Sequence, residues 1–172
     1  SKAYVPDACP FPQDDEFDGV KPETVFMFPG QGARVIGMGA DVAKEVPAAA
    51  ELYKKAAEIL GYDLLAIEDK AQLDKTDVSQ PAIFVASMAA VEKLRAESPE
   101  LVDKANMAMG LSLGEYTALC FAGAISFEDG VKITKARGEA MQAAAEQESS
   151  GMVSIIGLDK DACEKVCTAA TE

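Results

Sequence analysis

The chain has 172 residues, of which 49% are hydrophobic and 26% are charged, and its formal net charge is −13 at pH 7. This composition is typical of a folded protein with one domain, or with one domain and the start of another. The 29 acidic residues outnumber the 16 basic ones, which argues against nucleic acid as a partner, because binding it requires basic residues. No apolar run is long enough to span a bilayer, so we expect no membrane partner either.

The first 22 residues are expected to be a disordered leader. They mix prolines with acidic residues and show no helical or strand period, so they bury too little to offset the entropy of ordering. The folded part is predicted to begin at residue 23. Thr24–Phe28 is a continuous apolar run that ends at Pro29-Gly30, as expected of a strand buried on both faces.

Two helices are predicted next. The first covers Pro47–Leu60, because Pro47 suits a first turn, Gly61 suits a stop, and an apolar stripe repeats at helical spacing along Leu52, Ala56, Ile59 and Leu60. The second begins at Ser79-Gln80-Pro81 and ends at Ser98-Pro99.

The second half of the chain repeats the alternation of strand and helix. Residues 106–111 form a buried apolar run, and a helix should follow it through residue 122. Ser126 and Asp129 predict the start of a helix that runs to about Gln147. A strand over 152–156 and a helix from residue 159 onward complete the pattern, which favours an α/β fold with a largely parallel sheet.

The sequence contains four cysteines and no histidine. The cysteines are too scattered for a disulfide framework. Cys163 and Cys167 lie four apart in a predicted helix without other ligands nearby, so we expect ordinary thiols, no metal and no cofactor. Without a histidine, these residues cannot form a Ser-His or Cys-His pair among themselves.

Residues 110–114 (GLSLG) match the pattern G-x-S-x-G and lie between the predicted strand and helix. This is the setting of a nucleophile elbow, where Ser112 would sit on a strained turn whose neighbours at −2 and +2 must be small. Its hydroxyl would then lie at a helix N-terminus, where amide donors favour negative charge. The alternative is that Ser112 only caps the helix.

The residues around Ser112 also resemble those of a known family. Residues 110–119 (GLSLGEYTAL) and 122–129 (AGAISFED) resemble the active-site segment of malonyl-CoA:acyl carrier protein transacylases. Four further blocks occur in the family's order, and together the blocks cover the chain from residue 23 to its end: 28–32 (FPGQG), 79–82 (SQPA), 137–142 (RGEAMQ) and 155–158 (IIGL).

The resemblance implies an α/β-hydrolase-like core with a parallel sheet over 23–147. It also implies the beginning of an inserted ferredoxin-like subdomain over 148–172. Bacterial members usually carry histidine where Leu111 stands, and leucine there is similar to plastid enzymes. We therefore expect the chloroplast stroma, with the cytoplasm as the alternative.

By resemblance, Ser112 attacks the thioester of malonyl-CoA and passes the malonyl group to the phosphopantetheine thiol of acyl carrier protein, supplying fatty acid synthesis. The backbone amides of Gln31 and Leu113 would stabilise the oxyanion. For Gln31, an ordinary strand-end turn is the alternative. Lys132 and Lys135 are candidates for docking the acidic carrier protein.

The resemblance also assigns a substrate pocket. Arg137 would bind the free carboxylate of malonate, and Gln80 and Met141 would line the pocket. At helical spacing, Arg137 shares its face with apolar residues, which predicts a half-buried guanidinium that needs an anionic partner. A structural salt bridge to Glu115 or Glu139 is the alternative.

The family's general base is a histidine that comes later in the chain than any residue here. We therefore expect these 172 residues to be a partial record of a longer enzyme and to be inactive alone. A noncatalytic binding or scaffold fragment, a serine thioesterase or other hydrolase, and a polyketide-type acyltransferase remain alternatives.

Overall fold

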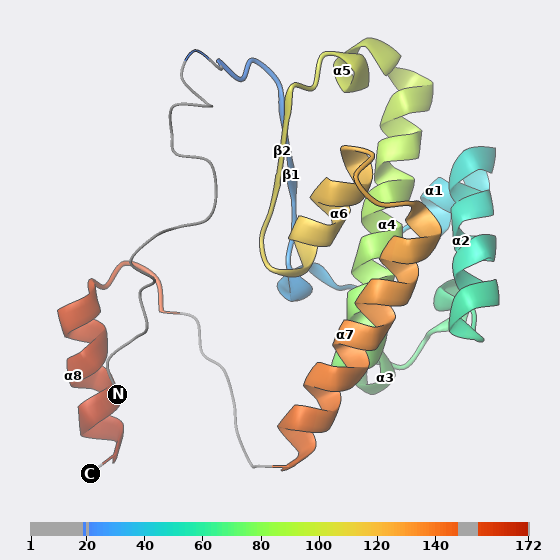
Figure 1. The fold of residues 1–172 in the computed structure, drawn as a ribbon. Coiled ribbons are helices and arrows are strands. Elements are labelled where there is room, and N and C mark those ends of the chain that lie inside the picture. The colour runs from blue at the N-terminus through green and yellow to red at the C-terminus, as the bar shows by residue number, and fades with distance from the viewer. Residues whose placement is uncertain (1–18, 20, 148–154, 172) are drawn as a thin grey trace.

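A two-stranded parallel sheet packs against a layer of helices in the main body of the protein (Figure 1). The structure, a computed structural model, describes residues 19, 21–147 and 155–171. Strand β1 (Val25–Phe28) pairs with β2 (Met107–Gly110), and Phe28 lies opposite Gly110. Both predicted strands are confirmed to within a residue or two, and because they are parallel, their carboxyl ends meet at one edge of the sheet.

The helices occupy most of the remaining chain. Those of the structure are α1 (Ala40–Glu45), α2 (Pro47–Leu60), α3 (Lys70–Asp74), α4 (Thr76–Glu97), α5 (Pro99–Asp103), α6 (Leu113–Phe121), α7 (Phe127–Gln147) and α8 (Lys160–Thr171), with single 3-10 turns at Gln31–Ala33 and Leu64–Ala66. The predictions of α2, α6, α7 and α8 are confirmed. Helix α4 begins three residues before the predicted start, and the short helices α1, α3 and α5 were not predicted.

Helix α2 shows how local signals set its ends. Pro47 occupies the first turn, and Gly61 adopts φ 84° while its amide bonds the carbonyl of Ala57. The buried stripe is turned slightly from the predicted one, because Leu52 and Ile59 are only half-buried. The residues that it buries are Ala49, Tyr53, Ala56 and Leu60.

Helices α4 and α7 cross closely, and this crossing positions the residues discussed below (Figure 1). Phe84 of α4 is fully buried and stacks on Phe127 with ring centroids 5.6 Å apart. Gly130 leaves the space that this ring fills, since a Cβ there would collide with it. At Gly138, a Cβ would lie 2.8 Å from the carbonyl oxygen of Thr76. Gly138 therefore lets the backbones of α4 and α7 approach closely, and Gly130 makes room for the Phe84 ring.

The two faces of the sheet differ. Phe26 and Phe28 lie on the face that packs against α6, where Phe26 stacks on Phe121 with centroids 4.5 Å apart. On the other face, Met27 is 76% exposed and Met109 is also exposed. The prediction that the first strand is buried on both faces is therefore wrong for the part of the chain that the structure describes.

The carboxyl-terminal segment is described in part. Of the predicted strand, residues 152–154 lie outside the described residues, and Ile155 and Ile156 are exposed and belong to no strand. Helix α8 begins where predicted, because the Asp159 carboxylate accepts a hydrogen bond of 2.9 Å from the amide of Ala162. The predicted leader lies almost entirely outside the described residues. No helix within the described ranges is long and apolar enough to cross a membrane.

These elements make a helix-rich α/β fold with a small parallel sheet. The hydrolase-like core over 23–147 and the ferredoxin-like start over 148–172 remain predictions.

Candidate active site

The turn between β2 and α6 holds Ser112 in an unusual backbone conformation. Its φ is 53° and its ψ is −102°, and among the described residues it is the only residue other than glycine with positive φ. Such a conformation costs about 1–3 kcal/mol and persists only where its surroundings enforce it. Strain at a serine between a strand and a helix is what a nucleophile elbow requires.

The two glycines that flank Ser112 explain why the turn can be so tight. A Cβ on Gly110 would collide with the backbone of Gly114, and a Cβ on Gly114 would collide with the backbone carbonyl of Phe28. Both obstacles are main-chain atoms, which cannot turn aside as a flexible side chain could. The prediction that positions −2 and +2 must be small is confirmed.

The Ser112 side chain points away from the helix that it precedes. It makes no capping hydrogen bond to α6. Its exposed Oγ instead accepts a hydrogen bond of 3.0 Å from Nη2 of Arg137 on α7. The alternative of Ser112 as a helix cap is therefore wrong for this geometry.

Arg137 is half-buried and held on several sides. Its Nη1 donates to Oε1 of Gln80 at 2.7 Å, and its Cζ lies 5.6 Å from the centroid of the Tyr116 ring. Among the described residues, no carboxylate lies within 4.0 Å of the guanidinium, so the alternative salt bridge to Glu115 or Glu139 is not formed. The guanidinium therefore carries a positive charge without an anionic partner.

Gln80 and Met141 continue this line of contacts. Gln80 is fully buried in the second turn of α4, and its Nε2 donates to Sδ of Met141 at 3.1 Å. Met141 lies one turn after Arg137 on α7 and is half-buried. The structure thus brings together four residues predicted from three separate segments: Ser112, Arg137, Gln80 and Met141.

Gln31 and Leu113 lie beside the same turn. Gln31 follows the carboxyl end of β1, and its side chain donates to Oγ1 of Thr76 at 3.3 Å. A Cβ on Gly30 would lie 3.0 Å from the carbonyl oxygen of Leu111, so the loop after β1 touches the residue before Ser112. Leu113 is the first residue of α6, where amides have no intrahelical acceptor. The two predicted oxyanion donors therefore lie in two segments that meet beside Ser112.

Comparison with known proteins places this arrangement in a family. The sequence model of the acyl transferase domain matches residues 25–169. The chain belongs to the acyl transferase domain family.

Relatives of this acyl transferase chain share its sequence and its fold. It is 44% identical over 152 residues to "Malonyl-CoA-acyl carrier protein transacylase, mitochondrial" of Mus musculus, covering 87% of this chain and 40% of the relative. It also resembles the crystal structure of the acyl-carrier-protein-S-malonyltransferase from Bartonella henselae, with a TM-score of 0.71 and 33% identity, over 85% of this chain and 48% of the other.

A third relative is a complex. The structure titled "PlMCAT:AntF (holo): type II PKS acyl-carrier protein in complex with its malonyl-transacylase" gives a TM-score of 0.70 at 32% identity, over 87% of this chain and 48% of that one. The acyl transferase chain thus spans less than half the length of each of these three relatives.

Tyr116 is the one residue at this acyl transferase site that the sequence did not single out. It lies four residues after Ser112 on α6, so it faces the same side of the helix. An aromatic residue one turn beyond the serine, opposite an unpaired arginine, is the signal that could have identified it.

The two lysines predicted to dock a carrier protein have other partners. Lys132 lies 3.3 Å from the carboxylate of Asp129, and Lys135 donates at 3.3 Å to the carbonyl of Leu60 at the end of α2. Nothing in this arrangement singles them out as a docking patch.

The thiol of Cys120, on α6, is not a competing nucleophile. Burial raises the pKa of the Cys120 thiol to about 11, so this thiol stays protonated at neutral pH. Within the described residues, no group of three or more potential metal ligands comes together.

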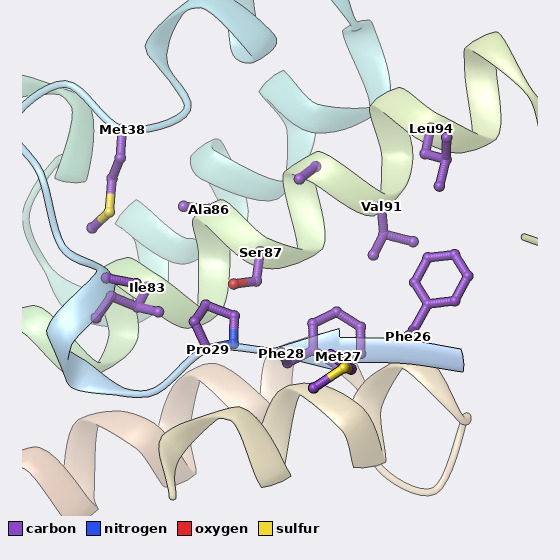
Figure 2. Close-up of a pocket in the computed structure, with 12 residues that line it drawn as sticks. Phe26, Met27, Phe28, Pro29, Met38, Ile83, Ala86, Ser87, Val91 and Leu94 are labelled. Atoms are coloured by element: carbon purple, nitrogen blue, oxygen red, sulfur yellow. The ribbon is translucent and has the colours of Figure 1, made fainter. Parts of the chain in front are cut away.

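An apolar groove between β1 and α4 (Figure 2) is lined by side chains such as Phe26, Ile83 and Leu94 and has no charged group in its lining.

Proposed function

We propose that this acyl transferase chain carries the nucleophile and the substrate-binding arginine of a malonyl-CoA:acyl carrier protein S-malonyltransferase of fatty acid synthesis. The observation that carries the proposal is the hydrogen bond of 3.0 Å between Arg137 and Ser112, made by a guanidinium without a carboxylate partner in the described residues. A cation this close to a nucleophile suits an acyl group that bears its own negative charge.

Malonyl-CoA has such an acyl group. Its free carboxylate lies two carbons from the thioester carbonyl that Ser112 would attack. A planar guanidinium can hold a carboxylate through two parallel hydrogen bonds, which fixes the substrate as well as attracting it. Acetyl-CoA lacks this carboxylate, so Arg137 would favour malonyl over acetyl groups.

The first half of the reaction forms an ester. Oγ of Ser112 attacks the thioester carbonyl, a C–O bond forms, the C–S bond breaks, and coenzyme A leaves as its thiol after taking up a proton. The negative charge on the carbonyl oxygen would be stabilised by the amides of Leu113 and Gln31 and by the N-terminus of α6. The base that takes the serine proton is not a histidine of these 172 residues, which contain none. The resemblance assigns this role to a histidine in a longer protein.

The second half of the reaction releases the malonyl group. The phosphopantetheine thiol of an acyl carrier protein attacks the ester on Ser112, a C–S bond forms, the C–O bond to Ser112 breaks, and the serine oxygen takes up the proton that the thiol loses. Support for this partner comes from the relatives, whose names include an acyl carrier protein and one of which is a complex with such a protein.

The location in the chloroplast stroma remains a proposal that depends on Leu111, which is exposed on the turn before Ser112. The Mus musculus relative is mitochondrial by name and the Bartonella henselae enzyme is bacterial, so neither supports it. Imaging a fluorescent fusion of the full-length precursor in plant or algal cells would test it, and a signal confined to mitochondria would overturn it.

One observation favours a second interpretation, in which the 172 residues are a noncatalytic fragment. Because the chain has no histidine, the 172 residues alone would bind acyl groups without turning them over, as a noncatalytic fragment does. We expect negligible malonyl transfer by the isolated chain, since a triad without its base retains only weak activity.

The decisive experiment uses the full-length protein that contains this sequence. After incubation with malonyl-CoA, mass spectrometry should find a malonyl ester on Ser112, and added holo-carrier protein should remove it. The Ser112→Ala variant should stay unmodified, whereas Ser87→Ala, a matched change on α4, should behave as the wild type. An unmodified Ser112 in folded protein would support a noncatalytic role. Release of free malonate instead of malonyl-carrier would identify a hydrolase.

A further inference from the structure

Gln80 has an unusual position for a polar side chain. It is 0% exposed, and it contacts Arg137 through Oε1 at 2.7 Å and Met141 through Nε2 at 3.1 Å. A buried amide keeps its partners because leaving its polar groups unsatisfied destabilises the folded state. Both partners lie on one face of α7, one turn apart, so a single helix determines how the amide sits.

The chemistry of the contact fixes the direction of the amide. A guanidinium has only donors, so it must face the carbonyl oxygen of Gln80. If the amide were reversed, its NH₂ group would point at the N–H groups of Arg137. Gln80 and Arg137 therefore hold each other in one arrangement.

Gln80 supplies an acceptor without supplying a charge. Its oxygen satisfies Nη1, the Tyr116 ring faces the guanidinium, and Nη2 is left directed at Oγ of Ser112. A carboxylate at position 80 would satisfy Nη1 equally well, but it would neutralise the cation. Because the described part of the chain places no carboxylate within 4.0 Å of Arg137, the charge remains available to a ligand.

We propose that Gln80 is a positioning residue that determines acyl-group specificity. Its oxygen accepts a hydrogen bond from Nη1 of Arg137 without neutralising the guanidinium charge, and this keeps Nη2 directed at Ser112. Gln80 acts through Arg137 and does not itself contact the acyl group, in contrast to the pocket-lining role that the sequence resemblance suggested. This inference rests on the proposed malonyl transfer.

The test compares Gln80→Glu with Gln80→Met in the full-length protein. Glutamate keeps the shape and the acceptor but adds a negative charge, and methionine keeps the approximate volume but removes the acceptor. Losing a charge-assisted contact costs about 1.5–3 kcal/mol, so malonyl-CoA binding in a Ser112→Ala background should weaken about 10- to 100-fold with glutamate. Acetyl-CoA binding should change less than about threefold, because no carboxylate is involved. Methionine should weaken malonyl-CoA binding by a smaller factor.

The control is Gln72→Glu on α3, an exposed position, which adds the same charge away from the site and should leave both affinities unchanged. Thermal unfolding checks that each variant is folded, and if the glutamate variant is not folded, the methionine variant decides. A structural role alone would weaken malonyl-CoA and acetyl-CoA binding equally, and that result would overturn the proposal.

A double-mutant cycle separates action through Arg137 from direct contact. In an Arg137→Ala background, Gln80→Glu should have no further effect on the ratio of malonyl to acetyl loading. A persistent effect there would show that Gln80 touches the substrate and would overturn the inference while leaving the proposed function intact. If wild-type protein fails to form a malonyl ester at all, the proposed function itself fails.

Discussion

The layer formed by α2, α4 and α7 is held together by buried side chains, whereas the turn that carries Ser112 is held in shape by main-chain contacts. In the helical layer, large apolar side chains such as Phe84 and Tyr53 are buried against one another. In the turn, Ser112 and Leu111 are exposed, and the shape is imposed by main-chain contacts between glycines and β1. The helical layer gains stability from burial, whereas the turn holds a strained conformation at a cost in stability.

The two regions meet at Arg137, which belongs to the helical layer, contacts Gln80 within that layer and donates a hydrogen bond to Ser112 in the turn. The helical layer therefore does more than stabilise the fold, because it also places the Arg137 guanidinium beside the Ser112 hydroxyl in the turn. Substitutions in the layer should therefore mainly lower the free energy of unfolding, and substitutions in the turn should mainly lower the reactivity of Ser112. Four predictions test that division.

The largest expected effect is on stability, from Phe84→Ala. Removing a fully buried ring should lower the free energy of unfolding by about 3–5 kcal/mol, because it leaves a cavity against Phe127 and Gly130. Denaturant unfolding would measure it. Leu119→Ala, which truncates an exposed side chain of α6, should cost much less, and similar costs for the two variants would contradict the division.

Gly114→Ala should affect both stability and reactivity. The new Cβ would meet the carbonyl of Phe28, and such overpacking costs about 1–3 kcal/mol. The displaced turn should also lose malonylation of Ser112, as measured by mass spectrometry. Gly32→Ala is the matched control, since a Cβ there has open space and Gly32 has no positive φ. Equal losses of stability in both variants would refute the steric argument.

Ser112→Gly should be more stable than Ser112→Ala by about 1 kcal/mol. Glycine relieves about 1–3 kcal/mol of backbone strain at φ 53° but adds about 0.4–1 kcal/mol of unfolded-state entropy. Neither variant can form the ester, so stability is the only readout, best taken from thermal or denaturant unfolding. An alanine variant more stable than the glycine variant by about 0.4–1 kcal/mol, the entropy difference alone, would mean that the turn holds no strain.

The smallest effect comes from the buried hydroxyl of Tyr53, which donates to the carbonyl of Met38 at 3.0 Å. Tyr53→Phe should cost about 0.5–1.5 kcal/mol near neutrality. Burial raises the pKa of Tyr53 from about 10 to about 12, so the folded state keeps the proton that the unfolded state loses. Stability that is present below pH 10 should therefore be lost as the pH rises toward 12, less steeply in the variant. Equal pH slopes in urea unfolding would contradict this.

Much of the fold could be predicted because particular residues mark the ends of its elements. Pro47 with Gly61, and Ser126 with Asp129, set the ends of α2 and α7 as expected. The short helices α1, α3 and α5 escaped prediction because five or six residues are too few to show an apolar period. Burial of the first strand on both faces was predicted from its apolar run alone, and composition does not say which neighbours cover a face.

The site was predictable in part. The pattern G-x-S-x-G and its context indicated the strained serine without any help from relatives. The contact between Ser112 and Arg137 could not be derived from spacing, because it joins residues 25 positions apart through the packing of α6 against α7. Helical spacing did predict a half-buried Arg137, but not that Gln80, a neutral amide, would be its partner.

The collision that a side chain at Gly114 would make with the end of β1 also has an evolutionary consequence. Residues 28–32 and 110–114 contact each other directly, so an insertion or deletion in the first segment would displace the turn that carries Ser112. Lineages should therefore change these two segments together and keep both lengths fixed. The exposed turn after Gly61 makes no such contact with the serine turn, so its length should vary more freely, although Gly61 itself should persist because of its positive φ.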